Sequence, residues 1–433
     1  MSLIRKLAAP RYDSYCKIWV KERFSEIGET GELGKMNVGI LLPSAEGGGV
    51  FQYALSIADG LIKYSNKFNY YIIYYDADSL NYLCSLNQSD VNFLFVPLKK
   101  RSFIGKINLL FNLTVGRNIF FNERKSEEVS KLKESDIQLM IIPFPSLFGF
   151  LNEIPYVVSI VDLMHKYYPS FPEYPLKERI IRDITYKNAV KHSALIIVDD
   201  QRGVIDLNRF YKVSKEKIRA IPYMPPGYIY EHKDMDLETA ESILAKYNLP
   251  ERFLFYPAQF WYHKNHLGLI KALKHVKQTH KIKIPVVLVG SPKESYKKIV
   301  NFTRESDISD QIVHLGYVSD REIVALYKKA VALVFPSLFG PTNIPPLEAM
   351  VLGTPVICSN LFSMPGQVDG AGLLFDPFNV DDMAEKIYTV WADGKLRENL
   401  VERGYWKAKD MTLENYAKRW EGIIDEALER INK

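Results

Sequence analysis

Short apolar runs alternate with longer helical or loop segments along this chain, and the alternation occurs in two series. The first series comprises NVGILLPS, NYYIIYYDA, NFLFVPL, IQLMIIPFP, PYVVSIVDL and ALIIVDD, and the second comprises FLFYPAQF, PVVLVGSP, QIVHLGYVS, ALVFPSLF and PVICSN. Buried strands that alternate with helices are typical of parallel sheets covered on both faces. The sequence therefore predicts an α/β protein with two Rossmann-like halves and a cleft between them.

A polar, proline-rich stretch, PYMPPGYIYEHKDMDLETAESILAKYNLPER, separates the two series and is typical of an interdomain linker. We divide the 433 residues into an N-terminal extension (1–34), a first Rossmann-like domain (35–225), a linker (226–250), a second Rossmann-like domain (251–410) and a C-terminal amphipathic helix (411–433).

Composition narrows the possible partners. The net charge of +5 suits phosphate-bearing ligands or an anionic membrane surface and is too small to indicate nucleic acid. The three cysteines, Cys16, Cys84 and Cys358, are scattered and lack metal-ligand spacing, which fits a reducing compartment. No apolar run approaches the ~18 residues of a transmembrane helix, and the N-terminus lacks the pattern of a signal peptide. We expect a cytoplasmic protein without a bound metal.

Two basic amphipathic stretches could bring this protein to the inner face of a membrane. Residues 99–111, KKRSFIGKINLLF, place apolar side chains on one helical face beside four cations, and the N-terminal LIRKL adds two more. This pattern suits peripheral contact with an anionic bilayer. It fits equally well a helix that packs on the sheet with a charged outer edge, so both interpretations stay open.

The stretch FPSLFGPTNIPPLEAM (335–350) carries the clearest chemical signal. An apolar strand end leads through a turn with Thr342 and Asn343 into a helix that contains Glu348. Free backbone N–H groups at Asn343 and Ile344 would form a natural seat for a phosphate. Asn343 could instead cap the helix, and Glu348 taken alone could be an acidic residue that favours a helix N-terminus.

A glycine-rich turn follows the first predicted strand. SAEGGGVFQYAL places Gly47, Gly48 and Gly49 between that strand and a helix. Glycines let the backbone approach a diphosphate or an acceptor closely, with a helix N-terminus behind them. A tight turn without a ligand is the alternative.

These segments together resemble the retaining nucleotide-sugar transferases of glycosyltransferase family 4, over roughly residues 36–430. The most specific matches are YPAQFWYHKNHLGLIKAL, VVLVGSP, HLGYVSDREIVALYKKA, FPSLFGPTNIPPLEAMVLGTPVICSN and AGLLFDP. The resemblance implies the GT-B fold, with an acceptor-side first domain, a nucleotide-sugar-binding second domain and a last helix that crosses back to the first domain. It implies transfer of a hexose, mannose or similar, from a nucleoside-diphosphate sugar to a saccharide or lipid-linked acceptor, without a cofactor, in cell-surface polysaccharide or lipopolysaccharide biosynthesis.

The resemblance also implies roles for donor-binding residues. Family members carry two glutamates eight positions apart; Glu348 matches the second, which binds the ribose, whereas Gly340 replaces the first, which contacts the sugar. Two cations face the diphosphate in the family; Gln259 replaces the arginine, and Lys264 matches the lysine. The glycine turn would face the same diphosphate across the cleft.

The resemblance implies further roles for residues that follow two of the predicted strands. Tyr317 and Val318 match the position at which the family holds the nucleotide base. In VVSIVDLMHKYYPSFPEY, Val161 replaces a family histidine, Asp162 remains, and His165 follows. Asp162 could orient an acceptor hydroxyl while His165 supplies the missing imidazole. Equally, Asp162 could cap the next turn and His165 could be an interior histidine.

The replaced residues leave two alternatives to an active transferase. The losses at Gly340, Gln259 and Val161 are compatible with a partner protein that binds sugar nucleotides without turnover, or with a sugar-nucleotide epimerase of the same fold. We expect an active enzyme, because backbone N–H groups and a lysine can stabilise a departing diphosphate without a carboxylate at position 340.

Overall fold

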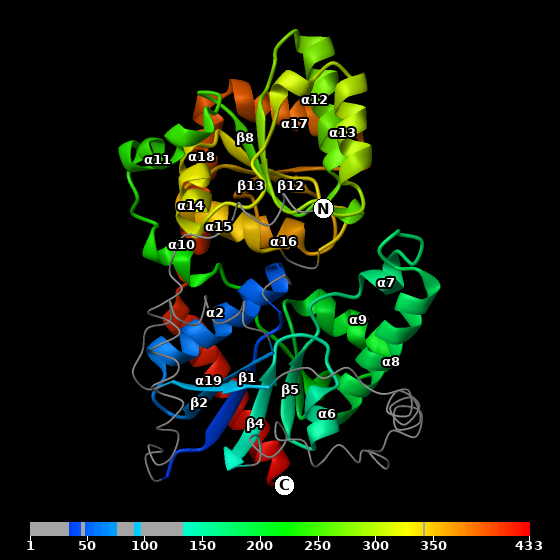
Figure 1. Ribbon diagram of the computed structural model, residues 1–433, viewed down its shortest axis with the longest axis vertical. Helices are drawn as coiled ribbons and strands as arrows, with labels where there is room; N and C mark the ends of the chain where they lie inside the picture. The colour runs from blue at the N-terminus through cyan, green and yellow to red at the C-terminus, as the bar shows by residue number, and fades with distance from the viewer. Residues whose placement is uncertain (1–33, 45–47, 76–90, 97–131, 133, 341–342) are drawn as a thin grey trace, which may run out of the picture.

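A computed structural model describes residues 34–44, 48–75, 91–96, 132, 134–340 and 343–433 of the chain. Two α/β domains lie one above the other in Figure 1, with the first domain below and the second above. The basic stretch 99–111, the N-terminal LIRKL, Gly47, Thr342, Cys16 and Cys84 lie outside the described residues. The predictions made for them therefore stay predictions.

The first domain is built on a seven-stranded parallel sheet with the order β3-β2-β1-β4-β5-β6-β7. Its strands are β1 (Asn37–Leu41), β2 (Asn69–Tyr74), β3 (Asn92–Phe95), β4 (Ile137–Ile142), β5 (Tyr156–Ser159), β6 (Leu195–Val198) and β7 (Ile218–Ala220). Its helices include α2 (Gly49–Tyr64), α6 (Phe148–Asn152), α7 (Met164–Tyr167), α8 (Leu176–His192) and α9 (Gln201–Tyr211). The first six strands were expected, and β7 was not.

The second domain is built on a six-stranded parallel sheet with the order β10-β9-β8-β11-β12-β13. Its strands are β8 (Leu254–Pro257), β9 (Val286–Val289), β10 (Ile312–His314), β11 (Ala332–Phe335), β12 (Val356–Ser359) and β13 (Gly372–Phe375). Its helices are α12 (His266–His280), α13 (Tyr296–Glu305), α14 (Asp320–Lys329), α15 (Ile344–Leu352), α16 (Met364–Val368), α17 (Val380–Ala392) and α18 (Gly394–Ala408). The prediction of two doubly covered parallel sheets is confirmed.

Two connections join the domains. Between the sheets in chain order lie α10 (Gly227–Glu231), which contacts α2, α14 and α15, and α11 (Leu237–Leu244), which packs on α14. The last helix, α19 (Leu413–Ile431), returns to the first domain and packs along α2, as Figure 1 shows in red and blue. Gly60 permits this close packing, because a Cβ there would lie 3.3 Å from the Leu413 carbonyl oxygen. The predicted crossing of the last helix is therefore confirmed.

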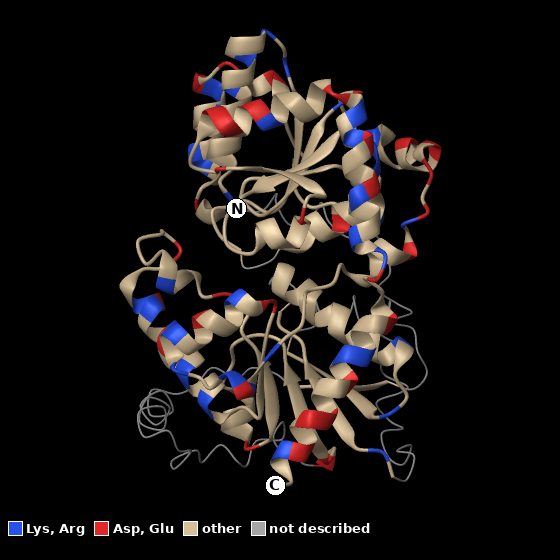
Figure 2. Cartoon of the chain, turned by 180° about the vertical axis from the view of Figure 1, so that it is seen from behind, with Lys and Arg blue, Asp and Glu red and all other residues tan. Residues whose placement is uncertain are grey.

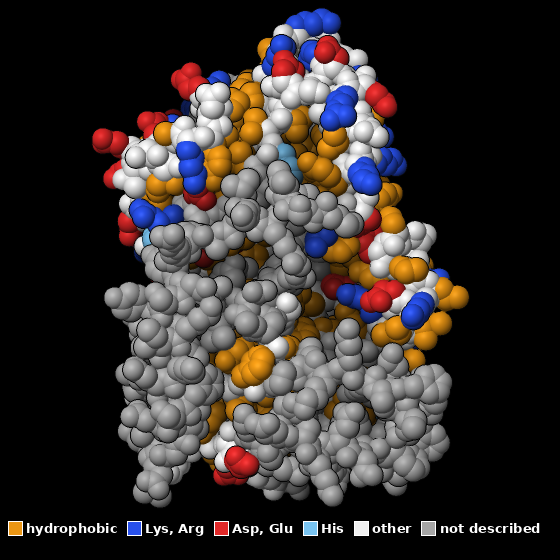
Figure 3. All heavy atoms as spheres, viewed as in Figure 1, with side chains coloured by type: hydrophobic (Ala, Val, Ile, Leu, Met, Phe, Trp, Pro, Cys, Tyr) orange, Lys and Arg blue, Asp and Glu red, His pale blue; other side chains and the backbone are white. Residues whose placement is uncertain are grey.

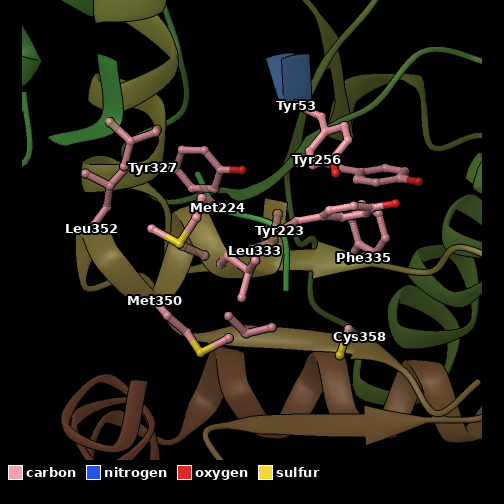
Figure 4. Packing of buried hydrophobic residues seen from close by; sticks show 14 of the residues in the cluster. Tyr53, Tyr223, Met224, Tyr256, Tyr327, Leu333, Phe335, Met350, Leu352 and Cys358 are labelled. Atoms are coloured by element: carbon pink, nitrogen blue, oxygen red, sulfur yellow. The ribbon is translucent and has the colours of Figure 1, made fainter. Parts of the chain in front are cut away.

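Apolar strands and helix faces form a buried cluster that runs through both domains. Figure 4 shows Tyr53 and Tyr223 of the first domain near Tyr256 and Phe335 of the second. The rings of Tyr53 and Tyr223 are 4.7 Å apart between centroids. Figure 2 shows charged residues mainly on helices and loops, with the strands largely uncharged. In Figure 3, acidic and basic side chains are interspersed over the described surface of the second domain.

None of the helices in the described part of the chain is long and apolar enough to cross a bilayer.

The contact of α19 with the first domain gives a stability prediction. Trp420 on α19 is fully buried, whereas Trp406 on α18 is 60% exposed. Trp420→Ala should lower the free energy of unfolding by about 3–5 kcal/mol because it leaves a large cavity. Trp406→Ala should change it by less than about 0.5 kcal/mol. Urea denaturation of both variants measures this difference, and equal effects would show that α19 is not part of the core.

Candidate functional site

Loops that follow the carboxyl ends of strands from both sheets meet between the domains, where open α/β sheets bind their ligands. Gly48, after β1, has φ of 57° and lies against Gln259, after β8. A Cβ at Gly48 would lie 3.3 Å from the amide nitrogen of Gln259. Gly49 is the first residue of α2. The structure thus places Gly48 opposite the second domain.

Lys264 ends a short 3₁₀ helix, η5 (Tyr262–Lys264), just before α12. Its ammonium nitrogen lies 5.2 Å from the centroid of the Phe335 ring, and its carbonyl oxygen accepts a 2.7 Å hydrogen bond from the Tyr256 hydroxyl. Burial lowers the pKa of Lys264 to about 8, while the negative charge of Asp162 acts in the opposite direction. No carboxylate of the described residues forms an ion pair with Lys264. Lys264 is therefore a partly buried cation whose charge is not balanced by a direct ion pair within the described residues.

Asp162 follows β5 and faces Lys264 from the first domain. Its Oδ1 accepts a 3.0 Å hydrogen bond from the Met164 N–H at the start of α7 and lies 3.4 Å from Nη1 of Arg182. The capping alternative for Asp162 is confirmed. Because a carboxylate has about four acceptor sites, capping leaves room for an acceptor hydroxyl.

His165 is an interior residue, 3% exposed. Its Nε2 lies 3.1 Å from the Tyr211 hydroxyl and 3.3 Å from Oδ1 of Asp183, and its ring packs edge-on against Tyr186. Burial lowers the pKa of His165. This geometry favours the interior alternative, so we assign His165 no part in the chemistry.

The start of α15 differs from the expectation at Asn343. We expected a free N–H at this residue, but it donates to Oε1 of Gln367 at 3.0 Å, and the Asn343 side chain does not cap the helix. Its amide instead occupies the space beside Gly340, where a Cβ would lie 2.1 Å from the amide nitrogen. Pro345 and Pro346 lack N–H groups, so Ile344 supplies the first N–H of this helix, and no acceptor among the described residues binds it.

Glu348 is the fifth residue of α15 and is 6% exposed, so it is not the helix-terminal acid of the simpler interpretation. Its Oε2 accepts a 2.6 Å hydrogen bond from Tyr327, and its Oε1 accepts a long one, 3.4 Å, from Tyr228 of α10. Burial raises the pKa of Glu348 to about 7, against the effect of the two tyrosine hydroxyls. The long bond leaves Oε1 with capacity for another donor.

Tyr317 and Val318 lie just before α14 and differ in exposure. The Tyr317 side chain is 73% exposed, whereas Val318 is buried at 4%. A nucleotide base could therefore stack on Tyr317, while Val318 can offer only its backbone.

Glu173 and His263 form a contact between the domains that the sequence did not reveal. Oε1 of Glu173, in the loop after α7, accepts hydrogen bonds from the backbone N–H of His263 at 2.9 Å and from its Nδ1 at 3.0 Å. His263 directly precedes Lys264. A pairing between loops of two domains leaves no periodic signal in a sequence.

A small hollow with a cavity volume of about 20 Å³ adjoins Asp162. It lies between the ends of β5 and β6, the start of α9 and two rings of the second domain, Phe339 and Phe362. Arg202 and Asp206 contribute opposite charges to its wall and pair at 3.3 Å. A cavity of this size has room for about one water molecule.

The described residues contain no group of three or more His, Cys, Asp or Glu side chains arranged to hold a metal ion. His266, near Lys264, is 1% exposed, and its ring stacks on Phe260 with a centroid distance of 4.3 Å. It is an interior residue of the second domain.

Residues 240–407 match the family model of the glycosyl transferases group 1. Over 174 residues the chain is 32% identical to O-antigen chain mannosyltransferase B of Escherichia coli, which covers 40% of this chain and 46% of that protein. Over 152 residues it is 30% identical to the serotype-specific mannosyltransferase WbdA of Escherichia coli, covering 35% of this chain and 19% of that protein. The chain thus aligns with less than half the length of these curated relatives.

Solved structures share the whole fold. A glycosyltransferase from Rickettsia africae has a TM-score of 0.68 at 16% identity, covering 91% of this chain and 99% of that one. HepE of Anabaena, in complex with UDP and glucose, has a TM-score of 0.69 at 14% identity, covering 90% and 99%. These similarities identify the GT-B fold, and the family match gives the chain a glycosyltransferase group 1 domain.

The raised pKa of Glu348 predicts a pH-dependent stability. Between pH ~4.5 and 7 the folded protein keeps a proton that the unfolded chain releases, so this residue's contribution to the free energy of unfolding is lost as pH rises through about 7. Glu348→Gln removes this titration. Relative to wild type, the variant should gain about 2–3 kcal/mol between pH 5 and pH 8, measured by urea denaturation. A difference that does not vary with pH would contradict the assignment.

Proposed function

We propose that this chain, with its glycosyltransferase group 1 domain at residues 240–407, is a retaining glycosyltransferase. It moves a hexose, mannose or similar, from a nucleoside-diphosphate sugar to a saccharide or lipid-linked acceptor in surface polysaccharide or lipopolysaccharide synthesis. The mannosyltransferase relatives support the sugar and the pathway class. The observation that carries the proposal is the desolvated Lys264 ammonium, which lies at the meeting of the two domains without an ion-pair partner among the described residues.

The donor diphosphate is held by groups from both domains. Lys264 supplies the cation, and the N–H of Ile344 at the start of α15 supplies a donor with a favourable helix dipole. Gly48 and the start of α2 approach from the first domain. As the bond to the sugar breaks, these groups stabilise the charge that develops on the diphosphate, and no protein nucleophile or metal takes part.

The nucleoside lies along α14 and α15. Oε1 of Glu348, with only the long bond from Tyr228, accepts a ribose hydroxyl, and the exposed ring of Tyr317 stacks on the base. The Tyr327 hydroxyl, 2.6 Å from Oε2, holds the Glu348 carboxylate in place.

The acceptor enters from the first-domain side. Asp162, which lies opposite Lys264 at the boundary between the domains, orients its hydroxyl. The hydroxyl oxygen bonds to the anomeric carbon as the bond from that carbon to the diphosphate breaks, and its proton passes to the departing diphosphate. Attack from the face that the diphosphate leaves gives retention. The contact between the domains excludes water from the reacting atoms.

We place the protein in the cytoplasm, with peripheral membrane contact through residues 99–111 and the N-terminus as part of the proposal.

A panel of nucleotides tests the donor site. One of GDP, UDP or ADP, with its sugars, should stabilise the protein by about 2.7 kcal/mol at 100 times its Kd. Glu348→Ala should weaken that nucleotide roughly tenfold, because a ribose contact is lost, which reduces the stabilisation by about 1.4 kcal/mol. Thermal shift measures both quantities. Glu385→Ala, an exposed acid on α17, is the matched control and should keep the full shift.

Transfer from the nucleotide sugar so identified then tests the reaction. Proton NMR of the first-formed product should show the anomeric configuration of the donor. Nucleotide binding without any transfer would favour a binding partner, and isomerised donor without an acceptor would favour an epimerase. Inversion in the product would contradict the retaining mechanism.

A further inference from the structure

The segment from Met164 to Tyr174 reaches from the first domain to the second. In Figure 1, α7 stands at the edge of the first domain that points toward the second. Rings of this segment pack against rings of the second domain: Tyr167 lies 5.1 Å from Phe362, and Phe171 lies 5.0 Å from Tyr262 between centroids. These contacts bring the segment against η5, the short helix that ends in Lys264.

Glu173 makes the polar contact of this segment with η5. Its side chain is 7% exposed, and its Oε1 accepts both the backbone N–H and the Nδ1–H of His263. Burial alone would raise the pKa of Glu173, but the hydrogen bonds from His263 keep it below its usual value. The carboxylate is therefore charged when it binds His263, and charge-assisted bonds of this kind are the stronger ones.

The remaining bonds of His263 come from the second domain. Its carbonyl oxygen accepts from the Leu338 N–H at 2.7 Å and from Oγ of Ser337 at 3.3 Å. The two N–H groups of His263 thus bind the first domain, and its carbonyl oxygen binds the second. Lys264 is the next residue, so the orientation of η5 sets the position of the Lys264 ammonium.

We propose that Glu173 is a positioning residue, which fixes η5 through His263 and so places Lys264 against the donor diphosphate only when the two domains are in contact. This inference rests on the proposed function and deepens it. Glu173 of the first domain would hold Lys264 of the second domain in the position that binds the diphosphate. Cleavage of the donor would then require the contact between the domains, which also brings the acceptor to the site.

A double-mutant cycle tests this coupling. Glu173→Ala should lower kcat by about tenfold to a hundredfold, because small displacements of a catalytic group are costly, with a smaller change in the KM of the donor. Glu173→Gln should retain most of the rate, since its amide oxygen can accept the same two bonds. In the Lys264→Met background, Glu173→Ala should cause no further loss, because the residue it positions is already absent.

Glu216→Ala, an exposed acid of the first domain, serves as the control and should leave kcat unchanged in both backgrounds. If the losses from Glu173→Ala and Lys264→Met add, Glu173 does not act through Lys264 and the inference is overturned. If the wild-type protein transfers no sugar with any donor, the proposed function fails, and the positioning role fails with it. If the wild type is active and the two losses add, only the positioning role fails. The activity of the wild type therefore distinguishes the two failures.

Discussion

The site depends on a lysine ammonium that has lost much of its hydration. Removing a cation from water is costly unless another charge compensates for it. For Lys264, that compensation comes in part from Asp162 across the domain boundary, and an anionic ligand would complete it. The surrounding structure serves this arrangement: parallel sheets direct their carboxyl ends toward the boundary, and α19 and α10 hold the domains together.

Much of the fold followed from the sequence, because buried parallel strands give continuous apolar runs and amphipathic helices give a 3.6-residue period. The exceptions are short strands. β7 has three residues and includes Arg219, which donates to the Glu426 carboxylate of α19 at 2.8 Å. β13 reads GLLF and is only partly buried over most of its length. Tertiary pairing, rather than local pattern, makes these segments strands.

The candidate site was predictable where it follows a strand end. Gly48, Gln259, Asp162 and Lys264 all come from such loops, and the structure places Gly48 against Gln259 and Asp162 opposite Lys264. Contacts between side chains of remote segments were not predictable. Glu173 with His263, Tyr228 with Glu348 and Gln367 with Asn343 pair residues 24 to 120 positions apart. Asn343 is an example: the local sequence predicted a free N–H, but this N–H donates a hydrogen bond to Gln367.

The most direct test of the central claim is the rate of sugar transfer by Lys264→Met at saturating donor. If Lys264 stabilises the departing diphosphate, kcat should fall by about 10²–10³, as for loss of a donor at an oxyanion site. Lys271→Met, an exposed lysine on the following helix, should keep the wild-type rate. A Lys264→Met enzyme with kcat within about threefold of wild type would contradict the account, since less than about 0.7 kcal/mol of the barrier would then depend on this cation.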